Sequence, residues 1–404
     1  MLNYINEIRQ LPSNIKQYLM ISANYWAFTL TDGALRMLVV LYFHQLGFNA
    51  LQIAFLFLFY EIFGVFTNLL GGWLGARLGL NKTMNVGLFL QVIALGMLAV
   101  PTEYLTITYV MFAQALSGIA KDLNKMSAKS AIKTLIPASE QGKLYRQVAK
   151  LTGSKNTLKG VGFFLGGVLL SAFGFKAAVL MMAAMLFSTW LCSLKLLAKG
   201  IGKSKSKPKF SQIFSTSRSV NLLSAARLFL FAARDVWFVV ALPVYLAQVF
   251  NWRYWVVSAV LAIWVIGYGV IQAQAPKVTV KKPSAKHASH WATMLLCTPI
   301  IIALTLHFDF YVKQLLLLEL LIFGAFFAVN SALHSYLIVS FARADNTSMD
   351  VGFYYAANAL GRLLGTLFSG WIYQLYGLQA CLWVSAGCIA MAALITAKLP
   401  PERH

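Results

Sequence analysis

Long apolar stretches separated by short polar breaks run along nearly the whole chain. A helix needs about 20 predominantly apolar residues to cross a bilayer. The pattern predicts twelve such helices, over residues 18–46, 50–74, 83–101, 104–128, 155–174, 176–197, 221–249, 254–274, 290–307, 311–339, 350–374 and 377–397. Three longer breaks are rich in lysine and lie at 129–154, 198–220 and 275–289. The sequence therefore predicts an all-α membrane protein with twelve transmembrane helices.

The composition agrees with this pattern. Of the 404 residues, 59% are hydrophobic and only 11% are charged, whereas soluble domains have about 45–50% apolar and about 25% charged residues. A soluble globular protein and a disordered chain are therefore both excluded. The net charge of +22 arises from 34 Lys and Arg against 12 Asp and Glu. In a soluble protein this excess would suggest nucleic-acid binding, but here the cations must be placed relative to a membrane.

The cations are distributed unequally between the two sides of the predicted membrane. The side that holds the N-terminus also collects the lysine-rich breaks and the C-terminus, and the opposite side receives Lys176, Arg253 and Lys313. Cytoplasmic segments carry an excess of Lys and Arg, so we expect both termini in the cytoplasm. Most of the charge is explained by this orientation and by attraction to anionic lipid headgroups. The lipid bilayer is thus an expected partner, and nucleic acid is not.

Corresponding residues recur 203 positions apart, as in many transporters that carry internal repeats. The matching pairs are Asp32 and Asp235, Tyr42 and Tyr245, Gln45 and Gln248, Lys159 and Arg362, Gly162 and Gly365, Gly167 and Gly370, and Gly174 and Gly377. This offset predicts two six-helix pseudo-repeats. The N-terminal half covers 1–197, a basic cytoplasmic linker covers 198–220, and the C-terminal half covers 221–404.

Several charged residues fall inside the predicted helices, where each costs at least about 2.5–3.5 kcal/mol near the bilayer centre and usually faces a partner or a cavity. On the first helix, Asp32 and Arg36 are four residues apart and can pair with each other. Helical spacing also places several polar groups on shared faces: Tyr25 with Thr29, Arg227 with Arg234, Lys155 with Lys159, and Tyr355 with Asn358 and Arg362.

These cations suit an anionic, multiply charged substrate. The guanidinium of Arg donates two parallel hydrogen bonds to adjacent phosphate or arsenate oxygens, and Lys supplies a mobile point charge. The candidate substrate-binding residues are Arg36, Lys121, Lys125, Lys159, Arg227, Arg234, Arg362, Tyr25, Tyr355 and Asn358. The structural alternative is that they form ion pairs within the helix bundle, or that lysines extend to the cytoplasmic surface. The carboxylates Asp32, Glu61, Asp235 and Glu319 are candidates for proton coupling or for ion pairing.

No motif points to catalysis or to a cofactor. The sequence has no Gly-rich nucleotide loop, no His-Glu-x-x-His and no Cys-x-x-Cys. The four cysteines, Cys192, Cys297, Cys381 and Cys388, lie in predicted helices and do not form a metal-binding or disulfide pattern. We therefore expect neither an enzyme nor an ATP-driven pump, and no metal or cofactor.

Two glycine-containing motifs resemble those of the major facilitator superfamily. The segment 72–79, Gly-Trp-Leu-Gly-Ala-Arg-Leu-Gly, resembles the signature Gly-x-Leu-Ala-Asp-Arg-x-Gly-Arg-Lys, but Ala76 replaces the Asp and Leu80-Asn81 replace the Arg-Lys pair. The segment 162–167 resembles the antiporter motif Gly-Pro-x-x-Gly-Gly, with Phe163 in place of Pro. The alternative reading of these glycines is close helix packing. The resemblance implies two six-helix halves around a central path, and transport by alternating access.

The segments 25–38, 55–61 and 67–75 resemble the ArsJ-type organoarsenical efflux permeases. That resemblance implies a bacterial inner-membrane protein that exports 1-arseno-3-phosphoglycerate and so confers arsenate resistance. It also implies a functional link to glyceraldehyde-3-phosphate dehydrogenase, which forms this ester when arsenate replaces phosphate. Such a substrate carries an anionic group at each end, in agreement with the cations inside the helices.

Other functions stay open from the sequence. An exporter or antiporter of another organophosphate, such as a sugar phosphate or a phosphoglycerate, would use the same cations. A drug/proton antiporter would need a net acidic cavity, against which the four arginines inside the helices argue. A polytopic membrane enzyme would need acid, base or metal-binding groups that the sequence does not bring together. Export driven by the membrane potential and proton antiport are both compatible with the sequence.

Overall fold

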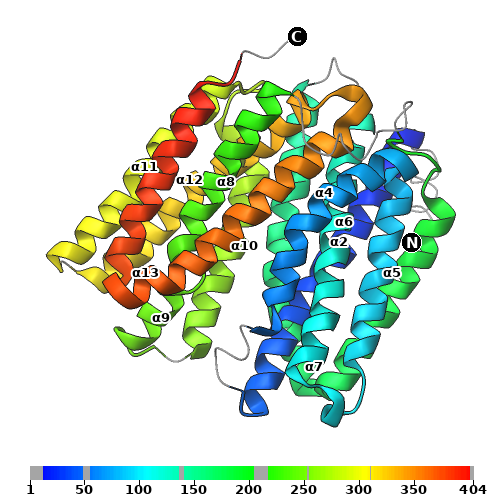
Figure 1. Cartoon of the computed structure of the whole chain (residues 1–404), viewed down its shortest axis with the longest axis horizontal. Coiled ribbons are helices and arrows are strands. Elements are labelled where there is room, and N and C mark those ends of the chain that lie inside the picture. Colours follow the sequence, from blue (N-terminus) through cyan, green and yellow to red (C-terminus); the bar gives the residue numbers. More distant parts are fainter. Residues whose placement is uncertain are drawn as a thin grey trace. The chain divides into compact units, whose positions relative to one another are not determined.

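The computed structural model describes residues 12–48, 55–135, 141–203, 217–252, 254–309 and 311–400. Throughout these ranges the regular secondary structure is helical and includes no strand. Figure 1 shows the long helices in the order of the chain. The predicted all-α fold class is confirmed.

The chain divides into two compact units. Unit 1 comprises Met1–Gln147, Val161–Phe214 and Arg343–Gly352, and unit 2 comprises Val148–Gly160, Ser215–Ala342 and Phe353–His404. Two short segments therefore belong to the unit opposite to the one expected from the predicted halves 1–197 and 221–404. The division into these halves stays a prediction.

Unit 1 is a helix bundle centred on α6 (Ile107–Leu135). This helix packs against α2 (Ser13–Gln45), α4 (Leu58–Leu78) and α5 (Leu80–Leu98), as Figure 1 shows. Its fully buried apolar core includes Leu35, Leu38, Val39, Phe43, Leu88 and Leu95. The 3-10 helix η1 (Thr102–Tyr104) connects α5 to α6, and most of α7 (Gln141–Leu196) completes the unit.

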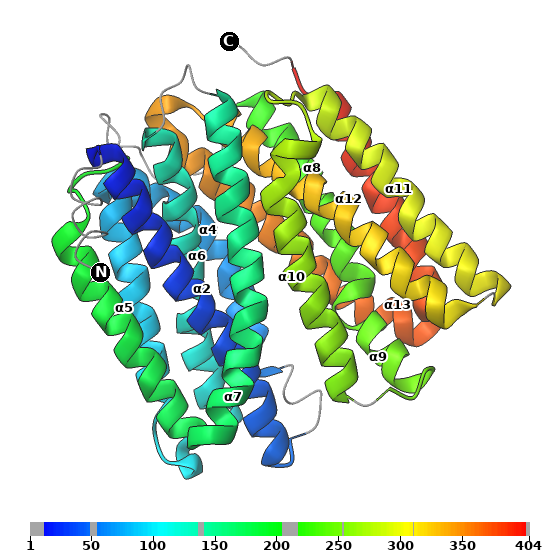
Figure 2. The ribbon, with the colours of Figure 1, turned by 180° about the vertical axis from the view of Figure 1, so that it is seen from behind.

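Unit 2 repeats this arrangement around α12 (Val312–Phe341). This helix packs against α8 (Arg218–Phe238), α10 (Tyr254–Val278) and α11 (Ala285–Phe308), which Figure 2 shows from behind. The 3-10 helix η3 (Ala344–Asn346) follows α12, and most of α13 (Thr347–Ala397) belongs to this unit. Aromatic residues fill much of the core, among them Trp237, Phe323 and Phe327.

The outer faces of the helices are apolar. Phe66, Leu196 and Trp371 are each about three-fifths exposed, with exposed fractions of 58%, 63% and 61%. Such apolar surfaces are unfavourable in water but suit contact with lipid. The helices satisfy their backbone polar groups internally, as lipid requires. By length and composition, seven of the described helices could cross a membrane. The number of twelve spans stays a prediction.

Two glycines 203 residues apart break the longest helices at equivalent points. Gly174 in α7 and Gly377 in α13 both have a φ of 74°, with ψ of 172° and −177° respectively. A side chain would be strained at this φ, by about 1–2 kcal/mol. Each long helix is thus two helices joined at a glycine, and both breaks fall where the hydrophobic pattern predicts a boundary. The shared conformation fits the internal repeat.

The predicted helix 221–249 is interrupted in the structure. Helix α8 ends at Phe238, and a short helix, α9 (Ala241–Gln248), follows after a break. Pro243 explains this break because its ring clashes with the carbonyl four residues earlier and it has no N–H to donate. The Ala241 N–H instead donates to Ser369 Oγ at 3.1 Å.

The lysine-rich break expected at 129–154 is wrong over its described part. Helix α6 continues to Leu135 and α7 begins at Gln141, so helix replaces most of the predicted loop. Lysine is a good helix former, and apolar residues such as Ile132, Leu144 and Val148 are buried between the lysines. Hydropathy detects the membrane-spanning part of a helix and not its continuation beyond the apolar core.

Glycine contacts explain why the two short segments join their units. Within unit 2, a Cβ on Gly153 would lie 2.5 Å from the carbonyl oxygen of Gly269. Within unit 1, a Cβ on Gly352 would lie 2.5 Å from the carbonyl oxygen of Asn68 and 2.9 Å from the Cα of Gly72. Backbones approach this closely only where a side chain is absent.

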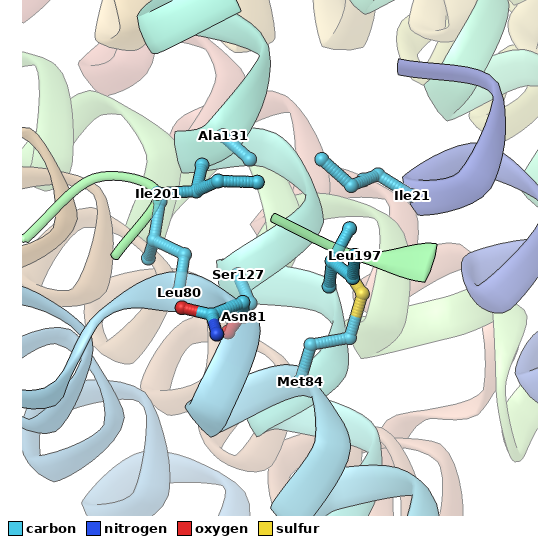
Figure 3. A pocket seen from close by; sticks show the side chains of 8 residues that line it. All are labelled: Ile21, Leu80, Asn81, Met84, Ser127, Ala131, Leu197 and Ile201. Carbon is cyan, nitrogen blue, oxygen red and sulfur yellow. The ribbon is translucent and has the colours of Figure 1, made fainter. Parts of the chain in front are cut away.

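The start of the predicted linker is anchored on the turn between α4 and α5. The Leu80 N–H donates to the Ile201 carbonyl at 2.7 Å, and Asn81 Oδ1 accepts from the Gly200 N–H at 3.2 Å. Figure 3 shows the neighbouring gap, which is too narrow for a water molecule and is lined by Ile21, Leu80, Asn81, Met84, Ser127, Ala131, Leu197 and Ile201. Residues 204–216 lie outside the described ranges.

Candidate functional site

Arg36 forms its ion pair with another helix and not with its own helix. Arg36 Nη2 lies 3.3 Å from Glu61 Oε1 on α4, and the guanidinium also lies 5.0 Å from the ring centroid of Phe57. Asp32 accepts a hydrogen bond of 2.6 Å from the Tyr60 hydroxyl. The predicted pairing of Asp32 with Arg36 is therefore wrong, because the packing of α4 supplies each of them with a different partner.

The lysines predicted on α6 surround a buried carboxylate. Asp122 is only 2% exposed, and it forms ion pairs with Lys125 and with Lys121, whose Nζ lies 3.7 Å from Oδ2. Lys121 Nζ also lies 3.7 Å from the ring centroid of Tyr60. These two lysines therefore share one negative charge and together keep a net positive charge.

Sequence reasoning missed a third lysine on this helix. Lys129 is 2% exposed, and the regular four-residue spacing after Lys121 and Lys125 could have indicated it. Its burial adds Lys129 to the interior cations Arg36, Lys121 and Lys125 of unit 1. The buried or partly buried carboxylates of this unit include Asp32, Glu61, Asp122 and Asp350.

In unit 2, two of the predicted arginines neutralise one aspartate. Asp235 is fully buried, and its two carboxylate oxygens pair with Arg234 and with Arg362, at 2.5 Å and 3.3 Å. The sequence places Asp235 next to Arg234, but only the packing of α13 against α8 brings Arg362 to the same carboxylate. Two positive charges share one negative charge here.

Arg227 differs from the other interior arginines. It is 3% exposed, its Nε donates to Asn358 Oδ1 at 2.8 Å, and its Nη1 donates to the Ser331 carbonyl at 3.4 Å. Its guanidinium lies 4.0 Å from the ring centroid of Phe231. Within the described residues, no carboxylate lies in ion-pair distance of Arg227. A buried cation without a counter-charge is costly.

The remaining predicted residues lie in different surroundings. Tyr25 and Tyr355 are buried on α2 and α13, and the ring of Tyr355 packs edge-on against Tyr354. Lys159 is half-buried on α7. Glu319 accepts a 2.6 Å hydrogen bond from Thr305 on α11 and is therefore part of the α11–α12 contact. It does not join the arginine groups.

The glycines of segment 162–167 bring α7 close to α2. A Cβ on Gly162 would lie 2.6 Å from the carbonyl oxygen of Leu30, and Gly166 directly contacts the Ala34 backbone. The equivalent Gly365 of α13 approaches the Ala232 carbonyl of α8 in the same way, at 2.9 Å. Close helix packing therefore accounts for Gly162, Gly166 and Gly365.

Ser331 is a further residue that sequence reasoning did not find. Its backbone carbonyl accepts a hydrogen bond from Arg227. Every residue has a backbone carbonyl, so no sequence signal identifies Ser331. Its position follows from the register between α8 and α12.

The pattern of interior charges within a repeated helix bundle agrees with the family comparison. The sequence model of the family described as Major Facilitator Superfamily matches residues 20–308, which is more than half of the chain. The chain belongs to the major facilitator superfamily. Members of this superfamily are transporters. This superfamily member is therefore a multi-pass membrane transporter.

Solved transporter structures share the fold. The human organic anion transporter MFSD10 has a TM-score of 0.75 at 15% identity, over 96% of this chain and 100% of that chain. A bacterial homologue of the iron transporter ferroportin, in an outward-facing state, has a TM-score of 0.74 at 12% identity, over 96% and 99%. The transporter FucP in the outward conformation also reaches 0.74 at 12% identity, over 96% and 100%.

A comparison with curated protein sequences gives no match. The names of these solved structures refer to different substrates. Because their sequence identity to this superfamily member is low, the similarity shows the fold alone. The substrate must therefore be argued from the charges of this chain.

Proposed function

We propose that this transporter exports a small organic polyanion by alternating access. The observation that carries the proposal is Arg227, a buried guanidinium without a carboxylate partner among the described residues. A buried charge usually has a counter-charge. An anionic substrate that binds beside Arg227 would provide this counter-charge during transport.

The other interior charges support an anionic substrate. In unit 2, Arg234 and Arg362 share the carboxylate Asp235, and Arg227 has only neutral hydrogen-bond partners among the described residues. The net charge of this group of four residues is positive. A positive interior attracts anions and repels cationic drugs and metal ions. The structural neighbour whose name describes an organic anion transporter is compatible with this proposal.

The proposed substrate is 1-arseno-3-phosphoglycerate. The support is the resemblance of segments 25–38, 55–61 and 67–75 to the ArsJ-type permeases, together with cations suited to an anionic group at each end of the molecule. Glyceraldehyde-3-phosphate dehydrogenase would supply the ester, and its export would confer arsenate resistance. The proposal places the protein in a bacterial inner membrane with both termini in the cytoplasm, and divides it into six-helix halves over 1–197 and 221–404.

The membrane potential favours export of such a substrate. Moving one charge across 100 mV is worth about 2.3 kcal/mol, and a trianion leaving a cell that is negative inside gains about three times this amount. Of the predicted coupling carboxylates, Glu61 and Asp235 pair with arginines, while Asp32 is held by Tyr60 and Glu319 by Thr305. If the transporter also exchanges protons, Asp32 is therefore a better candidate for the proton-carrying carboxylate than Glu61 or Asp235.

The test is arsenate resistance in cells that lack their own arsenate exporters. We expect resistance only when the transporter and the dehydrogenase are both present, and we expect Arg227→Ala to abolish it at unchanged protein level. Arg218→Ala is the matched control, because Arg218 is exposed in the first turn of the same helix. Resistance that persists without the dehydrogenase would refute the organoarsenical substrate.

The alternative substrate is another organophosphate, such as a sugar phosphate or a phosphoglycerate. Phosphate and arsenate groups are both tetrahedral oxyanions, so the contacts available at Arg227 would serve either of them. Uptake of labelled 3-phosphoglycerate into everted membrane vesicles separates the two proposals. Uptake that does not depend on arsenate, combined with a lack of arsenate resistance, would favour the alternative.

A further inference from the structure

Several buried polar atoms without a hydrogen-bond partner belong to residues one helical turn from Arg227 or from its two hydrogen-bond partners. In the described part of the chain, these are Ser224 Oγ, both ring nitrogens of His334, and the Tyr354 hydroxyl. All three side chains are buried. Buried polar atoms are nearly always hydrogen-bonded in folded proteins, and an exception calls for an explanation such as a ligand or an internal water.

Helix register brings these three residues to the same guanidinium from three helices. Ser224 lies one turn before Arg227 on α8. His334 lies one turn after Ser331 on α12, whose carbonyl accepts from Arg227, and Tyr354 lies one turn before Asn358 on α13, whose amide oxygen also accepts from it. The Arg227 Cζ lies 5.3 Å from the Tyr354 ring centroid.

The chemistry of the group is that of an anion-binding site. Arg227 supplies positive charge, the Tyr354 and Ser224 hydroxyls can each donate one hydrogen bond, and a neutral imidazole donates from one of its nitrogens. The acceptors that the chain itself provides, Asn358 Oδ1 and the Ser331 carbonyl, are already bonded to Arg227. Unused donors beside a cation without a carboxylate fit an incoming group that is rich in acceptor oxygens.

We propose that Ser224, His334 and Tyr354 complete a subsite around Arg227 that binds one tetrahedral oxyanion of the substrate, a phosphate-type or arsenate-type group. This subsite lies entirely within unit 2. The inference rests on the proposed transport of a polyanion and assigns to these three residues the hydrogen bonds that orient one end of the substrate.

The experiment measures ligand-induced thermal stabilisation of the purified full-length protein in detergent. Inorganic phosphate, inorganic arsenate and 3-phosphoglycerate are the probes, because a ligand that binds the folded state raises the unfolding temperature in a concentration-dependent way. We expect Tyr354→Phe to weaken the apparent affinity for these probes about ten-fold, and Ser224→Ala and His334→Gln to weaken it as well. Tyr354→Phe removes only a hydroxyl, so it serves as the deciding variant if His334→Gln fails to fold.

Ser385→Ala is the matched control. Like Ser224, Ser385 is a buried serine whose hydroxyl has no hydrogen-bond partner. Ser385 lies on α13, beyond the break at Gly377. We expect this variant to bind the probes as the wild type does. An equal loss of affinity in Ser385→Ala and Ser224→Ala would overturn the subsite.

The outcomes separate the subsite from the proposed function. If none of the three probes stabilises the wild type, the anionic substrate itself is refuted. If the probes stabilise the wild type and Tyr354→Phe equally, the subsite is wrong while anion transport stands. If Tyr354→Phe and Ser224→Ala raise the unfolding temperature without ligand and keep full affinity, these atoms bind internal water only, which also overturns the subsite.

Discussion

Arg36 and Glu61 form an ion pair between α2 and α4, with 3.3 Å between Nη2 and Oε1. This contact occupies the arginine that helical spacing would assign to Asp32. Asp32 instead accepts a hydrogen bond from Tyr60, the residue next to Glu61. Two adjacent residues of α4 therefore hold two charged residues of α2, and they fix the register between these helices.

Glu61→Gln should destabilise the protein more than Asp32→Asn does. The first variant leaves Arg36 without its counter-charge, and the expected loss is about 1–3 kcal/mol, reduced from that of a fully buried pair by partial exposure. The side chains of Arg36 and Glu61 are 31% and 23% exposed. In Asp32→Asn the amide oxygen can still accept from Tyr60. Unfolding of both purified variants in detergent checks this order, and equal losses would contradict it.

Asp235→Asn should cause one of the largest losses of stability in unit 2. The fully buried carboxylate faces Arg234 and Arg362, and removing one partner from a buried ionic group costs about 3–5 kcal/mol. Adding Arg362→Gln to this variant should recover part of the loss, because one unpaired cation is then removed.

The control for this prediction is Asp309→Asn. Asp309 is exposed, and its φ of 50° suits asparagine at least as well as aspartate. We expect its unfolding temperature to match that of the wild type. A double variant of Asp235 and Arg362 that is less stable than Asp235→Asn alone would show that the two residues do not act through their charges.

Neighbouring glycines on α7 should respond in opposite ways to alanine. Gly166 lies against the backbone of Ala34, so Gly166→Ala should force α7 away from α2 and cost about 1–3 kcal/mol. At Gly167 an added Cβ would only touch Leu41, at 3.9 Å. Because alanine favours helix over glycine by about 1 kcal/mol, Gly167→Ala should be neutral or stabilising. Thermal unfolding of the two variants side by side is the measurement, and a comparable loss in both would contradict the packing assignment.

Asn81→Ala should release the first part of the linker. The variant removes the acceptor of the Gly200 N–H, and a hydrogen bond of about 1 kcal/mol corresponds to about five-fold more opening. Limited trypsin digestion should then cut at Lys199 or Lys203 about five-fold faster. Lys82→Ala is the control, because Lys82 is the exposed next residue. Unchanged cleavage of Asn81→Ala would show that the Leu80–Ile201 bond suffices.

The repeat and the helical class could be predicted from the sequence because both depend on local or periodic features. Apolar length identified most of the helices, and the 203-residue offset matched Gly174 to Gly377, which share one backbone conformation. The approach failed where lysines lie in helix beyond the apolar core, at 129–154, and where Pro243 divides a helix whose hydropathy is continuous.

The sequence also indicated which charges lie inside the helices, since an ionisable residue within an apolar stretch is visible without coordinates. It could not determine their partners. Helical spacing predicted that Arg36 pairs with Asp32 on its own helix, but Arg36 pairs with Glu61 of α4. In unit 2, the packing of α13 brings a second arginine to Asp235, while the partners of Arg227 are neutral. Partner choice depends on the register between helices, which side-chain packing sets over the whole bundle. Only the tertiary structure therefore distinguished the arginines that pair with carboxylates from Arg227, whose hydrogen-bond partners are neutral.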